Sequence, residues 1–189
     1  MINRQSLWAV FVLVVLAAPM SAQAYSYAAA GKEPLIDGRE ALLAAVNKED
    51  WVAAKLAFET MHDEIKYLDE HHASGLLEQM TEQLEAKSAT GVGEAIVKAF
   101  VAEIERRLSA AAKSLKDYQT AKVLVVKSHR LFQATAGEFS PQRRADAEQA
   151  LKAALEAIGN PGVFGVGRKP ADPEAYQEAY ESVLKAIAK

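Results

Sequence analysis

The sequence contains no cysteine, and this absence excludes several kinds of site at once. Without a thiol there can be no disulfide framework, Cys-x-x-Cys-His haem attachment, iron–sulfur cluster, cysteine nucleophile or thiolate zinc site. Glycine and proline are also scarce, with 10 and 6 residues in a chain of 189, whereas alanine makes up about a fifth of it. This composition favours helices and argues against a strand-rich sandwich or a glycine-rich disordered chain.

Clustered positive charge is the next thing the sequence lacks. The 22 Lys and Arg residues are outnumbered by 25 Asp and Glu residues, which gives a formal net charge of −3 at pH 7. Because binding to a phosphate backbone needs clustered cations, we expect no nucleic-acid partner. No serine, threonine or lysine has a local base in the pattern of an activated nucleophile, so we also expect that the protein is not an enzyme.

The first 24 residues are typical of a secretory signal peptide. Arg4 supplies the positive charge, residues 7–18 form an apolar run, and Ala22-Gln23-Ala24 is an A-x-A cleavage site. The run is shorter than the about 20 apolar residues of a membrane-spanning helix, which disfavours the alternative of an uncleaved anchor. We therefore expect a periplasmic mature chain of residues 25–189 that meets a membrane only through its signal peptide, before cleavage.

The mature chain carries helix signals throughout and no strand pattern. Apolar residues spaced three and four apart predict helices over residues 40–46, 51–74, 76–84, 94–136, 141–158 and 173–188, the fourth of which fits either one long helix or two in tandem. Asp37 and Glu40 resemble a capping box, and Ser140-Pro141 and Asp172-Pro173 each combine an N-cap with a proline at the first helical position. We expect an all-α fold, an antiparallel helical bundle of four or more helices in one domain, residues 25–189.

Two glycine-containing segments, residues 88–93 and 159–170, are predicted to be loops. The second combines four glycines with two prolines and one large apolar residue, Phe164, which we expect to pack back on the bundle. Gly165-Val-Gly167 followed by Arg168 suggests phosphate binding, but the strand and the Gly-Lys-Ser/Thr sequence of a P-loop are missing. A partner-binding or lid element is the alternative to a plain connector.

Two carboxylate–histidine pairs lie on the predicted helix over residues 51–74. Glu59 precedes His62 by three residues, and Asp69 precedes His72 by three, which is about one helical turn and lets two side chains bind one ion. On a continuous helix His62 and His72 are about 15 Å apart, so the two pairs cannot share a metal. Each pair is therefore a candidate half-site for a divalent transition metal, namely iron, zinc or copper.

A structural role for the histidines is the alternative. On a helical projection His72 shares the stripe of Leu68, and His129 shares a face with Phe132. In this interpretation His72 and His129 are hydrogen-bonded core residues, and the other polar residues form a solvated face.

Residues 53–64, followed by Tyr67-Leu68-Asp69 and by the long helix with Phe100 and Leu108, resemble the periplasmic helical domains of bacterial iron-uptake systems. These are the extracytoplasmic domain of iron permeases and, more remotely, imelysin-like proteins. The resemblance covers about residues 38–136 and includes no membrane permease portion. It implies a metal-binding accessory protein beside a membrane transporter or another periplasmic protein, with Glu59, His62, Asp69 and His72 nearest the metal. A non-catalytic interaction or scaffold bundle is the alternative function.

Overall fold

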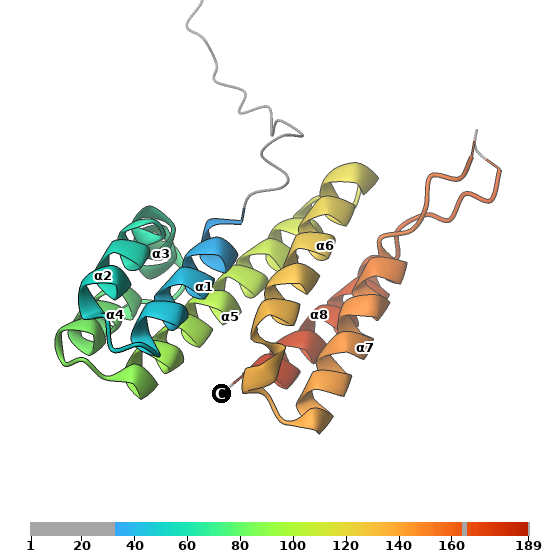
Figure 1. Cartoon of the computed structure of the whole chain (residues 1–189). Helices are drawn as coiled ribbons and strands as arrows, with labels where there is room; N and C mark the ends of the chain where they lie inside the picture. The colour runs from blue at the N-terminus through green and yellow to red at the C-terminus, as the bar shows by residue number, and fades with distance from the viewer. Residues whose placement is uncertain (1–32, 164–165, 189) are drawn as a thin grey trace, which may run out of the picture. The chain divides into compact units, whose positions relative to one another are not determined.

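A computed structural model describes residues 33–163 and 166–188, and the predicted signal peptide lies outside these ranges. The described chain is helical and belongs to one compact unit, Glu33–Lys189, which confirms the all-α prediction. Its α-helices are α1 (Pro34–Val46), α2 (Trp51–Glu59), α3 (His62–His71), α4 (Leu76–Glu85), α5 (Ala89–Lys113), α6 (Tyr118–Thr135), α7 (Pro141–Ala157) and α8 (Pro173–Ile187), with a short 3-10 turn, η2 (Ala136–Glu138), after α6 (Figure 1). Among the described residues, no helix combines the length and the apolar character needed to span a bilayer.

Helix α5 is the element that most of the others contact. It packs against α1, α3, α4, α6 and α8, while α7 and α8 form a closely packed pair of their own. The predicted long helix over residues 94–136 is two helices that lie side by side, α5 and α6, joined by a short turn (Figure 1). Asp117 ends that turn, and its Oδ1 accepts from the backbone N–H groups of Gln119 and Thr120. This N-cap explains why α6 restarts there.

The predicted helix over residues 51–74 is wrong in one respect, because it is broken after Glu59. The Thr60 hydroxyl donates to the Ala57 carbonyl oxygen at 2.7 Å. The next residue, Met61, is buried, with only 1% of its surface exposed. Met61 packs onto Gly38 of α1, where an added Cβ would lie 2.2 Å from the Met61 Cγ. The close contact between α1 and the helix break at residues 60–61 therefore depends on Gly38, which has no side chain.

The predicted loop over residues 88–93 is also wrong, because this segment begins α5. Ser88 is the N-cap, with its hydroxyl oxygen accepting from the Gly91 N–H at 3.1 Å. An added Cβ at Gly91 would lie 1.9 Å from the Gln83 side-chain oxygen on α4. Gly91 therefore lies in the first turn of α5, against the Gln83 side chain of α4, and does not mark a loop.

Helix starts that rest on local capping signals are mostly as predicted. The Ser140 hydroxyl oxygen and the Asp172 carboxylate accept from backbone N–H groups in the first turns of α7 and α8, and a proline follows each. The first helix instead begins at Pro34, because proline suits the first helical position, and Asp37 lies in its first turn.

Replacing Phe58 with alanine tests the packing of α2. Phe58 is 6% exposed, whereas Val52 on the same helix is 73% exposed. We expect Phe58→Ala to lower the free energy of unfolding by about 3–5 kcal/mol because a buried aromatic ring leaves a cavity. The control, Val52→Ala, should change it by less than about 0.5 kcal/mol. Chemical denaturation measures both, and equal effects would contradict the burial of Phe58.

Candidate functional site

The first predicted metal pair, Glu59 and His62, is divided between two helices. Glu59 is exposed at the end of α2, and His62 begins α3 after the break. The His62 Nδ1 lies 3.5 Å from an oxygen of Asp63, and its ring meets Phe58 edge-on with centroids 5.9 Å apart. The one-turn spacing argument needs a continuous helix, so it does not apply to this pair.

The second predicted pair, Asp69 and His72, has its carboxylate engaged in a structural contact. The Asp69 Oδ1 accepts from the Leu77 backbone N–H at 3.2 Å, in the first turn of α4. His72 is exposed at the C-terminal end of α3, so its predicted place in the core is wrong. Helix α3 ends at His71 and His72 is its C-cap, with a φ of −138°, so the projection, which assumed a helix to residue 74, does not apply to His72. Across the described ranges no three Cys, His, Asp or Glu side chains converge to form a metal site.

His129 is hydrogen-bonded but is not a core residue. Its Nε2 lies 2.6 Å from the Glu148 Oε2, and 39% of its side chain is exposed. The pair joins α6 to α7 at the edge of an apolar groove that includes Val125 and Leu155. The prediction of a partner for His129 is confirmed, whereas its full burial is wrong.

Sequence reasoning missed a buried charge cluster between α1, α5 and α6. The Arg107 Nη2 lies 2.6 Å from the Glu33 Oε2, and the Arg107 Nε contacts the Glu103 Oε1. Arg106 also binds Glu103, at 2.5 Å, and the Lys127 ammonium lies 3.1 Å from Glu33. Glu103 is 0% exposed and Glu33 only 2%. The spacing of Glu103, Arg106 and Arg107 at three and four residues was the available signal.

The electrostatics of this cluster indicate a structural role. Burial raises the pKa of Glu33, but the hydrogen bonds and positive charges of Arg107 and Lys127 outweigh it and leave that pKa below its usual value. Nearby Glu64 has a raised pKa, first because it is buried and then because of the Glu103 charge. The cluster holds the start of α1 against α5, since Glu33 immediately precedes α1.

The charge cluster should make stability depend on pH. The folded-state pKa of Glu33 is lower than its unfolded-state pKa. The contribution of Glu33 to the free energy of unfolding is therefore fully present at pH above the unfolded-state pKa, and it is lost as pH falls through the folded-state pKa. We expect Glu33→Gln to lower the free energy of unfolding by about 1.5–3 kcal/mol at pH 7, with the difference from wild type narrowing as pH falls below about 4.3. Denaturation from pH 3 to 7 measures this. A constant difference across that range would contradict the pairing.

Between α7 and α8, residues 160–163 pair with residues 166–169 through isolated β-bridges, and these two segments are called the arm. Asn160 and Lys169 exchange two backbone hydrogen bonds of 2.8 and 2.9 Å, and Val163 and Val166 exchange two of 3.1 and 3.0 Å. Val163 is 74% exposed and Val166 is 80% exposed. The prediction that Phe164 packs on the bundle falls on a residue outside the described ranges.

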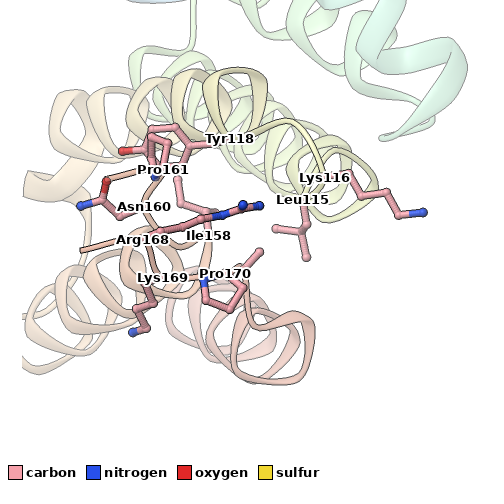
Figure 2. A pocket seen from close by; sticks show the side chains of 10 residues that line it. Leu115, Lys116, Tyr118, Ile158, Asn160, Pro161, Arg168, Lys169 and Pro170 are labelled. Atoms are coloured by element: carbon pink, nitrogen blue, oxygen red, sulfur yellow. The ribbon is translucent and has the colours of Figure 1, made fainter. Parts of the chain in front are cut away.

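A basic pocket lies where the arm meets the turn between α5 and α6 (Figure 2). Its volume is about 390 Å³, and its lining includes Lys116, Arg168 and Lys169 but no acidic side chain. The Arg168 side chain extends across this space, and Tyr118 lies beside Pro161 (Figure 2). In a chain of net charge −3, this is a local excess of positive charge.

The acidic residues that flank the pocket in the sequence already have partners. The Asp117 carboxylate accepts from the Thr120 hydroxyl at 2.7 Å and from two backbone N–H groups, and these hydrogen bonds lower its pKa. Asp172 accepts from the Ala175 N–H at 3.0 Å. Both carboxylates therefore cap helices. No acidic side chain lines the pocket, although Lys169 also lines a neighbouring groove that includes Glu156 and Asp172.

Comparison with family models, curated proteins and solved structures finds no match to this chain. The resemblance to periplasmic iron-uptake domains therefore stays a prediction.

Proposed function

We propose that this protein is an exported, non-catalytic interaction bundle that docks through its arm. The observation that carries the proposal is the exposure of Val163 and Val166, which are 74% and 80% accessible. Large apolar side chains in the helices are mostly buried in a shared core. Two valines held outside that core on a paired, two-stranded element are typical of a contact surface.

The helices do not need the arm, and this also supports a binding role. Helices α7 and α8 pack closely, and the Asp172 N–H donates to the Ala157 carbonyl oxygen at 2.8 Å. The chain therefore leaves α7 and returns to α8 at adjacent points, although 14 residues, 158–171, lie between. A much shorter connection joins most packed helix pairs. Long connections commonly carry function, and this one exposes Val163 and Val166.

Site-specific photo-crosslinking in producing cells tests the docking role of the arm. A benzophenone amino acid is placed at Val166 or, as a control of similar exposure, at Val52 of α2. We expect adducts with another macromolecule or with lipid to form several-fold more often from position 166. Equal yields from the two positions would contradict docking through the arm.

Metal handling beside a membrane transporter, the function implied by the resemblance, is a second candidate. One observation favours it: the His71 and His72 rings are neighbours, with centroids 6.4 Å apart, and both residues are exposed. Exposed imidazoles bind transition metals when further ligands come from solvent or from a partner. Together with Glu59, His62 and Asp69, they make α3 and its two ends the region to test.

Metal binding is measured by titrating the untagged protein with Fe(II), Zn(II) and Cu(II). If α3 binds metal, we expect saturable binding tighter than millimolar that His62→Ala or His72→Ala weakens at least tenfold, because each removes an imidazole ligand. Binding should weaken in acid, since protons compete for imidazole nitrogens. His129→Ala is the control, because His129 lies on α6 and is paired with Glu148. Millimolar or weaker binding would contradict the second candidate.

A further inference from the structure

We propose that the arm docks on an anionic lipid surface. Val163 and Val166 would lie in the membrane interface, and Arg168 and Lys169 would lie among the lipid headgroups. This inference rests on the proposed docking function and names the partner. It adds a membrane contact of the folded chain to the one expected of the signal peptide.

The order of side chains along the arm matches the layers of a membrane interface. Val166 is followed after one residue by Arg168 and Lys169, and Val163 lies opposite Val166 in the paired backbone. Three residues span at most about 10 Å, and the positive φ of Gly167 makes the path from Val166 to Lys169 shorter than that, so the cations lie within about one headgroup layer of the valines. Interfacial elements enter this boundary by about 5–10 Å. The spacing therefore allows apolar and ionic contacts at the same time.

The residues of the arm itself carry the sign of charge that an anionic surface requires. No Asp or Glu occurs from residue 157 to residue 171, whereas Arg168 and Lys169 lie in that stretch. Lys116 joins them from the turn before α6, on the lining of the pocket. Each cation close to an anionic membrane strengthens binding by about fivefold.

The backbone of residues 160–163 disfavours strand addition by a protein partner on this half of the arm. On its first strand, the N–H groups of Asn160 and Val163 bond within the arm, and that of Gly162 donates to the Asn160 side chain at 2.9 Å. Pro161, the remaining residue, has no N–H. This strand therefore offers no free donor to a protein strand. The same internal pairing reduces the penalty for moving backbone groups out of water.

Co-sedimentation with vesicles tests the proposal. The full chain is produced in cells, and the exported protein is purified. Mass spectrometry then identifies the fraction whose chain begins at Tyr25, and this fraction is used. It is mixed with vesicles of phosphatidylcholine alone or with 30% phosphatidylglycerol as the probe surface. We expect binding only to the anionic vesicles, and weaker binding at 1 M than at 0.1 M salt, because the screening length falls from about 10 to 3 Å.

Two double variants separate the contributions, and each has a matched control. Arg168→Gln/Lys169→Gln should weaken binding at least tenfold, and its control is Arg144→Gln/Lys152→Gln, two exposed cations of α7. Val163→Ser/Val166→Ser should weaken it similarly, and its control is Val52→Ser/Leu56→Ser, with two side chains at least 66% exposed. The controls should bind as wild type does. Thermal unfolding should be unchanged in the arm variants because the arm lies outside the core.

Three outcomes would overturn the lipid assignment. They are no binding to anionic vesicles, equal binding to neutral vesicles, and arm variants that bind as tightly as their controls. If vesicles fail while a crosslink from position 166 joins the arm to a protein, the docking function stands and the partner is that protein. If both experiments fail, the docking function itself is wrong.

Discussion

The buried carboxylate of Glu103 is the constraint on which much of the helix arrangement depends. A charge at 0% exposure is tolerated only with close partners, because removing an ion from water costs several kcal/mol even after relaxation. Its partners, Arg106 and Arg107, lie on the same helix, and Arg107 in turn requires Glu33, which is 74 residues away in sequence. Helix α5 is thus tied to Glu33, the residue that precedes α1, and the cluster fixes where the start of α1 packs against α5.

Small residues constrain the fold in two ways, as helix caps and as points of close contact between helices. Only the first of these can be predicted from the sequence. Caps such as Ser140 and Asp172 act within one turn of chain, so their effect is readable from sequence. The glycines at 38 and 91 act instead through partners on other helices, Met61 and Gln83. A local interpretation takes Gly91 as a loop signal and sees no reason for the break before His62. Both errors arose because tertiary packing overrode local pattern.

The difference between local sequence signals and contacts with distant residues also applies to the two candidate sites. The metal prediction used spacing on a helix assumed to be continuous, and the structure uses Asp69 for a capping hydrogen bond to Leu77 instead. Composition alone identified residues 159–170 as unusual, because four glycines and two prolines in twelve residues are rare in a helical chain. Composition could not predict the pairing of Val163 with Val166, which depends on backbone conformations such as the positive φ of Gly162 and Gly167.

The helical bundle provides the stability of the fold, whereas the arm carries the proposed binding surface. Arg143 secures the C-terminal end of α8 by donating to the backbone oxygens of Ala186 and Ala188, so the α7–α8 pair is closed at both ends without the arm. The chain as a whole is negative, whereas the base of the arm is positive. Beyond the screening length of about 10 Å the net negative charge of the bundle has little effect on an anionic surface, so the charges nearest to that surface decide whether it is attracted. The proposed anionic partner would therefore approach this protein at the arm, where two exposed valines lie next to Arg168 and Lys169.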